Sequence, residues 1–145
     1  MLDGILAIET YGLAHVALKV ADIERSFRFY HRLLGARLLG DLEGRDDQDL
    51  TDRKVIEFGT PASRDVIVLM RADEPVTGET GQLEHFGFRL VSPEDPARVA
   101  AAFEEAGGTV GSKGHFSDGD PYVFGRDPDG YIIELWFQHE AKWRS

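Results

Sequence analysis

The chain has 145 residues, 42% of them hydrophobic and 29% charged, which is the composition of one ordinary globular domain with a substantial core. Its formal net charge of −10 disfavours nucleic acids and anionic membrane surfaces as partners, because both are polyanions. The chain has no cysteine, no apolar run long enough to cross a bilayer and no basic signal-peptide region at its start, so a cytoplasmic location is expected.

The first half of the chain predicts a strand, a helix and three more strands. Residues 13–20, LAHVALKV, alternate as a strand does and place His15 on the face opposite the apolar residues. Asp22 is suited to cap a helix whose apolar residues recur at helical spacing until Gly35. The three strands are expected at about residues 36–42, 55–59 and 65–71. The acidic residues 41–52 are interpreted as a solvated hairpin loop without a functional role.

The second half repeats this order. Residues 83–91, LEHFGFRLV, resemble the first strand and place His85 at 85 − 15 = 70 residues after His15. Asp95 and Pro96 begin the second predicted helix, and Gly107 ends it. Strands are then expected at about residues 109–116, 121–125 and 131–137. The sequence therefore predicts one domain, 1–145, built from two βαβββ modules at about 11–72 and 82–138.

The last predicted strand, YIIELWF, contains one carboxylate, Glu134, in an apolar run. Alternation places it on the side of the strands that also carries His15 and His85. Two imidazoles and a carboxylate form the 2-His-1-carboxylate set that binds a divalent metal, and a metal would offset the cost of burying Glu134. The alternative is two core histidines bonded to backbone, with Glu134 paired to Arg89 or Lys19. The matched positions within a repeat favour the metal site.

The paired βαβββ halves, their His-bearing first strands and the sequence DPDGYIIEL resemble the vicinal oxygen chelate superfamily, from Leu13 to Phe137. The resemblance implies an α+β fold in which both modules form an open, eight-stranded, barrel-like cup around a metal, with flanking helices. It also implies a small-molecule substrate and a homodimer, with modules paired within one chain or swapped between chains. The superfamily includes glyoxalase I, extradiol dioxygenases, methylmalonyl-CoA epimerase, fosfomycin-modifying transferases and metal-free drug-binding proteins.

Laying the last strand of one half on that of the other places Val68 opposite Glu134. In glyoxalase I and the epimerase this first-half position typically supplies a fourth ligand, which Val68 cannot do. Glu57, on the preceding strand, could do so only with a different register. Three protein ligands favour a non-haem Fe(II) oxygenase, so Fe²⁺ is the first candidate metal, with Mn²⁺, Zn²⁺ and Ni²⁺ as alternatives.

The segment HFSDGDPYVFGRDPDGYIIE resembles the extradiol dioxygenase motif. The residues that match in order and spacing are His115, Val123, Asp127, Pro128, Gly130 and Glu134. Phe124 stands where the family has Tyr, and Tyr122, two residues earlier on the same face, could substitute for that hydroxyl. His115 is either a catalytic acid/base or an exposed loop residue. Ile132 and Trp136 flank Glu134 and give the site an apolar wall.

The leading hypothesis is an Fe(II)-dependent, extradiol-type dioxygenase acting on a small catechol-like substrate, with His15, His85 and Glu134 as metal ligands and His115 and Tyr122 as catalytic residues. The second is a metal-dependent lyase or transferase of the glyoxalase or fosfomycin-modifying type. The third is a metal-free small-molecule binding protein. The intact set of two histidines and a carboxylate argues against this last class, because a sequestering pocket needs no such set.

Overall fold

The computed structural model of the chain describes residues 4, 8–10, 13–39, 53–59, 64–79 and 81–139. The acidic stretch expected to form a hairpin loop, 41–52, lies outside them. The elements, in chain order, are β1 (Val16–Val20), α1 (Ile23–Leu34), β2 (Arg37–Leu38), β3 (Arg53–Gly59), β4 (Arg64–Arg71), β5 (Phe86–Arg89), α2 (Pro96–Glu105), β6 (Thr109–His115), β7 (Pro121–Arg126) and β8 (Ile132–Trp136). The predicted α+β fold of two βαβββ modules is confirmed. Neither helix in this part of the chain is long and apolar enough to cross a membrane.

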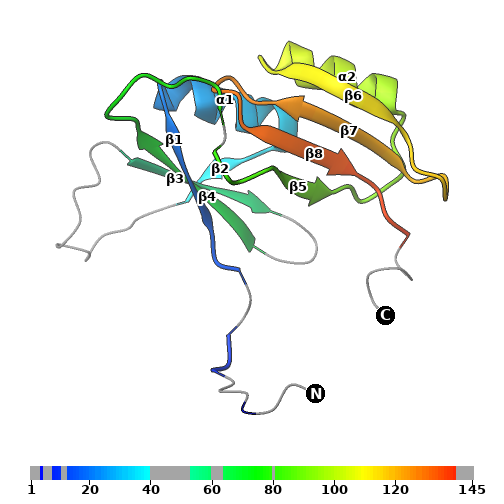
Figure 1. The fold of residues 1–145 in the computed structure, drawn as a ribbon, viewed down its shortest axis with the longest axis horizontal. Helices are drawn as coiled ribbons and strands as arrows, with labels where there is room; N and C mark the ends of the chain where they lie inside the picture. Colours follow the sequence, from blue (N-terminus) through cyan, green and yellow to red (C-terminus); the bar gives the residue numbers. More distant parts are fainter. Residues whose placement is uncertain are drawn as a thin grey trace.

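Each module forms its own four-stranded sheet, in the orders β1-β4-β3-β2 and β5-β8-β7-β6. In both sheets the first strand runs parallel to the last, and the remaining pairs are antiparallel. Figure 1 shows the two sheets beside each other, with α1 and α2 on the same side of the molecule. The strands described do not pair across the modules, so the two sheets are not closed into a barrel.

Helix boundaries follow the capping residues that the sequence predicted. The Asp22 side chain accepts a hydrogen bond from the Arg25 backbone N–H, and Gly35 ends α1 with a φ of 71°, in the left-handed region where glycine is unstrained. Asp95 caps α2 in the same way, with Pro96 as its first residue. The one difference is that the C-cap of α2, which follows its last residue Glu105, is Ala106 and not Gly107.

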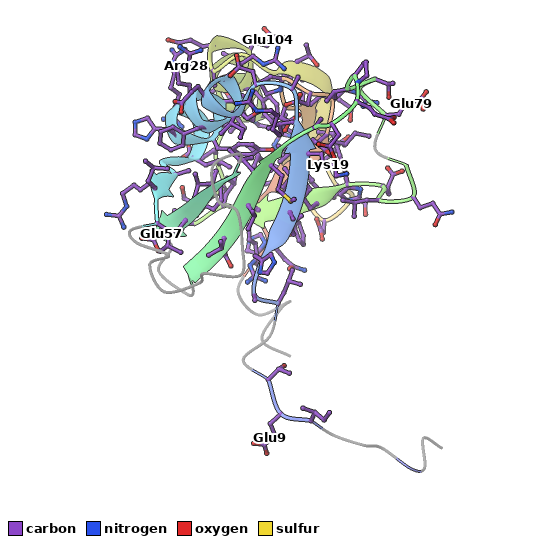
Figure 2. The ribbon with its side chains drawn as sticks, turned by 90° about the vertical axis from the view of Figure 1, so that its left-hand side faces the viewer. Glu9, Lys19, Arg28, Glu57, Glu79 and Glu104 are labelled. Carbon is purple, nitrogen blue, oxygen red and sulfur yellow. The ribbon has the colours of Figure 1, made fainter. Side chains whose placement is uncertain are left out.

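One core joins both modules beneath the helices. The inward residues of the strands, such as Leu18, Leu69 and Ile133, are fully buried. Phe29 of α1 packs edge-on against Phe103 of α2, with ring centroids 5.4 Å apart. The opposite faces of the sheets are open. Figure 2 shows Lys19 on β1 and Glu57 on β3, to either side of β4.

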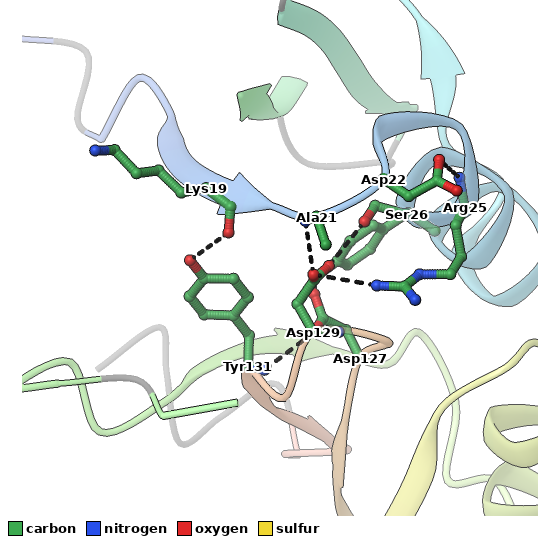
Figure 3. A network of polar contacts seen from close by, with 9 residues as sticks. Lys19, Ala21, Asp22, Arg25, Ser26, Asp127, Asp129 and Tyr131 are labelled. Carbon is green, nitrogen blue, oxygen red and sulfur yellow. Dashed lines mark hydrogen bonds and ion pairs between the residues drawn. The ribbon is translucent and has the colours of Figure 1, made fainter. Parts of the chain in front are cut away.

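The Asp127-Pro128-Asp129-Gly130 turn between β7 and β8 fastens the second module to the start of α1 in the first (Figure 3). One Asp129 carboxylate oxygen accepts hydrogen bonds from the Ala21 N–H at 2.9 Å and the Arg25 guanidinium at 3.2 Å, and the other accepts from the Ser26 hydroxyl at 3.0 Å. Sequence reasoning assigned this segment to a tight turn and missed the contact between modules.

Asp127 completes the same network from inside the turn. Its carboxylate accepts from the Tyr30 hydroxyl at 2.7 Å and from the backbone N–H groups of Asp129 and Tyr131. Gly130 has a φ of 99°, and a Cβ there would lie 2.5 Å from the Cα of Gly78. The two backbone segments therefore approach too closely for any side chain at position 130. Turn and helix are thus locked together by buried polar contacts directly before β8.

Burial raises the pKa of Asp127 above its ordinary value of 3.8, although its hydrogen bonds oppose the shift. A carboxyl whose pKa is raised by folding stabilises the protein only while it is protonated. The free energy of unfolding should therefore fall as the pH rises from below 3.8 through the raised pKa.

Asp127→Asn should remove this pH dependence, because an amide of the same shape cannot ionise. We expect the free energy of unfolding of D127N, relative to the wild type, to increase between acidic and neutral pH. Urea unfolding at a series of pH values measures it. Asp73→Asn, at an exposed position, is the matched control and should follow the wild type. Parallel pH profiles for D127N and the wild type would contradict the expectation.

Candidate metal centre

His85 and Glu134 meet on the open face of the second sheet. His85 directly precedes β5, and Glu134 lies in the middle of β8, which pairs with β5 in parallel. The His85 Nε2 and Glu134 Oε2 atoms are 3.2 Å apart, and the side chains are 33% and 14% exposed. The neighbouring β8 residues Ile133 and Leu135 are buried in the core, so alternation directs Glu134 away from it.

The surroundings of this pair fit a cation better than a purely structural contact. His85 Nδ1 is buried and has no hydrogen-bond partner among the described residues, so the ring is not a core histidine tied to backbone. In this part of the chain Glu134 forms an ion pair with His85. An imidazole nitrogen and a largely buried carboxylate oxygen are donors for a divalent metal. The donor set therefore fits two of the three predicted ligands.

His15 does not join this pair within one chain. It lies one residue before β1 and is exposed. Among the described residues, no three His, Cys, Asp or Glu side chains are close enough together to hold a metal ion. The structure thus brings His85 and Glu134 together and leaves the three-ligand set a prediction.

Strand pairing confirms that Val68 and Glu134 occupy equivalent positions. Val68 pairs with Ala17, two residues after His15, and Glu134 pairs with Gly87, two residues after His85. Ile67 and Leu69, on either side of Val68, are buried in the core, so the half-buried Val68 faces the open side. At equivalent positions on the open side, β4 of the first module therefore carries Val68 and β8 of the second carries the carboxylate of Glu134.

Glu57 also lies on the open side of the first sheet, because it pairs with Val66 of β4. Its carboxylate is 3.8 Å from the guanidinium of Arg37 on β2, at the edge of the sheet. The register is the one expected from the sequence, which assigned the position equivalent to Glu134 to Val68 and not to Glu57. Glu57 is therefore paired with Arg37 on β2, the strand of this sheet that lies farthest from β1.

The two predicted catalytic residues lie in different places. Tyr122 pairs with Trp136 on β8 and shares the open face with Glu134. His115, the last residue of β6, is exposed and pairs with Pro121, whose side chain is buried on the helix-covered face. The structure thus places Tyr122 near the His85–Glu134 pair and directs His115 to the other side of the sheet. A catalytic role for either residue remains a prediction.

Comparison with known proteins identifies the family. The model described as the Glyoxalase/Bleomycin resistance protein/Dioxygenase superfamily matches residues 12–135. The chain belongs to this superfamily. The superfamily resemblance seen in the sequence is thereby confirmed, and with it the relation to enzymes of several chemistries.

Two relatives of this superfamily member are named for one activity. A probable lactoylglutathione lyase of Vibrio parahaemolyticus is 28% identical over 130 residues, covering 85% of this chain and 88% of that protein. The lactoylglutathione lyase of Escherichia coli O157:H7 is 29% identical over 131 residues, covering 89% and 94%. These relatives make a lyase as reasonable an expectation as a dioxygenase.

Solved structures of the superfamily share the fold. The fosfomycin resistance protein FosX of Listeria monocytogenes, solved as a complex with Mn(II) and a dihydroxypropylphosphonic acid, has a TM-score of 0.69 at 16% identity, covering 94% of this chain and 98% of FosX. A glyoxalase-related enzyme of Fulvimarina pelagi has a TM-score of 0.63 at 20% identity, covering 89% of each chain. At these identities the similarity is one of fold alone.

Proposed function

We propose that this superfamily member is a divalent-metal-dependent enzyme whose metal is held by His15, His85 and Glu134. The close contact of His85 with Glu134 supports this assignment most directly. Fe²⁺ is the first candidate and Mn²⁺, Zn²⁺ and Ni²⁺ are the alternatives. A cytoplasmic location, expected from the absence of cysteine, is part of the same proposal.

The site is proposed to be completed in a homodimer. One chain brings two of the three proposed ligands together on the open face of its second sheet, and His15 lies apart from them at the start of β1. The open face of the first sheet is lined by the half-buried Val66, Val68 and Met70, which a second copy could cover. We infer that His15 of one protomer joins His85 and Glu134 of its partner.

The proposed reaction is ring cleavage of a small catechol-like substrate by an Fe(II)-dependent dioxygenase. A bound divalent cation would supply positive charge to two vicinal oxygen atoms of the substrate. The chain's own contribution is three ligands, with Val68 keeping the fourth position free of a protein donor. Tyr122 would donate a hydrogen bond from the open face, and His115, which lies toward the other side of the sheet, is assigned no step within one chain.

A lyase or transferase is the second candidate, and the names of the relatives favour it. The two chemistries separate experimentally. Protein purified anaerobically and loaded with one metal at a time is assayed for oxygen uptake across catechols and for lactoylglutathione lyase activity. Oxygen uptake with Fe²⁺ supports the dioxygenase. Lyase activity without oxygen consumption would assign the chemistry to the second candidate. Activity that is fully retained in the metal-free protein would overturn the metal-dependent proposal.

Val68→Glu tests the three-ligand arrangement. A carboxylate at this position would face the metal as Glu134 does, and we expect the variant to retain metal while losing oxygen-dependent activity about tenfold or more, or about 1.4 kcal/mol of transition-state stabilisation. Metal content and initial oxygen-uptake rates measure the two effects. Val68→Ala leaves the position without a donor and should stay near wild-type activity. Full oxygen-dependent activity in V68E would contradict a need for the open position.

A further inference from the structure

Four aromatic side chains form a continuous surface on the open face of the second sheet. We call it the aromatic platform; its members are Phe116, Tyr122, Phe124 and Trp136. The Phe116 and Tyr122 rings stack with centroids 4.5 Å apart and planes 29° apart. Trp136 meets Phe116 edge-on at 6.4 Å, and Phe124 meets Tyr122 at 5.8 Å. Phe116 remains 40% exposed, so part of this residue is open to a ligand.

The platform runs directly into the predicted metal ligands. Phe124 pairs with Glu134 across β7 and β8, and its ring packs edge-on against His85 with centroids 5.2 Å apart. An apolar, flat surface therefore ends at an imidazole and a carboxylate. A ligand that follows this surface would have a planar apolar part over the rings and polar donor atoms beside His85 and Glu134.

Backbone contacts hold the platform in place without a ligand. The hairpin between β6 and β7 is closed by hydrogen bonds between Phe116 and Asp120 and between Gly119 and Phe116. Gly114, opposite Tyr122, leaves room for the phenol, since a Cβ there would lie only 3.3 Å from the Tyr122 hydroxyl oxygen. The rings are thus prearranged, which lowers the entropic cost of binding a flat ligand.

We propose that the aromatic platform binds the planar, apolar part of the substrate and selects substrates with a fused or aryl-substituted ring. The inference rests on the proposed function only for the part of the ligand that carries the two oxygen atoms, which would bind the metal. Stacking of the ring on the platform needs no metal. Phe116 is the specificity-determining residue, since it offers the most exposed ring and contacts both Tyr122 and Trp136.

The test uses the 145-residue chain, both as purified and after metal removal with a chelator. The probes are naphthalene-2,3-diol, which is planar and bicyclic, and cyclohexane-1,2-diol, which carries vicinal oxygens on a puckered ring. Isothermal titration calorimetry gives Kd. Phe116→Ala should weaken naphthalene-2,3-diol binding about 5- to 10-fold in both protein forms, as expected for the loss of one stacked aromatic contact. Phe116→Tyr keeps the ring and should bind as the wild type does.

Several outcomes would overturn the platform. Equal naphthalene-2,3-diol affinities in F116A and the wild type would do so, as would equal affinities for the two diols. If sedimentation showed a dimeric wild type and a monomeric F116A, the platform would be assigned to the protomer interface instead. Phe116-dependent ring binding in a protein that takes up none of the candidate metals when each is added back would refute the proposed function and leave the platform standing.

Discussion

Replacing Asp129 by alanine is expected to lower the free energy of unfolding by about 3 kcal/mol, because it removes a buried acceptor and leaves the buried Ser26 hydroxyl without this partner. The Asp129 carboxylate is shared by the Ala21 N–H, the Ser26 hydroxyl and the Arg25 guanidinium. Ser26 is completely buried, so in D129A its hydroxyl loses this partner. The Arg25 contact adds little, since its side chain is 44% exposed and screened by solvent.

Urea unfolding of D129A against the wild type measures this loss. Glu94→Ala is the matched control, because it removes a carboxylate from an exposed ion pair with Arg98 one helical turn along, and its effect should stay within about 0.5 kcal/mol. An unfolding free energy of D129A equal to that of E94A would show that the contact does not fasten the modules.

Replacing Glu134 by alanine is expected to weaken metal binding by at least about 100-fold, more than the loss of an indirect supporting contact, and to abolish metal-dependent activity. The wild type should gain about 2.7 kcal/mol of stability at a free-metal concentration 100 times its Kd, and E134A should gain at most about 0.4 kcal/mol. Without metal, the stability lost in E134A should stay within about 1 kcal/mol, because the His85 and Glu134 side chains are 33% and 14% exposed and a solvent-accessible pair contributes little.

The control for this result is Glu84→Ala. Glu84 lies next to His85, with a carboxylate oxygen 3.6 Å from the His85 Nδ1, but its side chain is 82% exposed. The Glu84→Ala substitution removes one negative charge, as Glu134→Ala does, without removing a predicted ligand. The metal affinity of E84A should therefore stay near that of the wild type. Thermal unfolding with and without each candidate metal gives both comparisons. Metal-induced stabilisation of E134A equal to that of the wild type would exclude Glu134 as a ligand.

Local features of this fold are readable from the sequence because each has a local physical cause. Asp22 and Asp95 cap helices through their own side chains, and strand alternation separates Leu18 from His15. The internal repeat goes further, since it places Val68 and Glu134 in equivalent registers before any pairing is known.

Other features depend on contacts between distant parts of the chain, and no local pattern predicts them. The turn at 127–130 has the composition of any tight turn, so its contact with α1, about a hundred positions earlier, was missed. Phe116, in a polar loop, has no periodic neighbours that would indicate its stack on Tyr122. The separation of His15 from His85 and Glu134 within one chain depends on how the two sheets are arranged, which the repeat does not specify.

The most direct measurement mixes two variant chains. His15→Ala and Glu134→Ala homodimers should each fail to bind the metal. If His15 of one protomer joins His85 and Glu134 of its partner, a heterodimer of the two variants contains one intact site and one doubly damaged site. Refolding an equal mixture, isolating the heterodimer by differential affinity tags and measuring its metal content should then give one metal per dimer with partial recovery of activity. A heterodimer as empty of metal as its parents would contradict a site built from two chains.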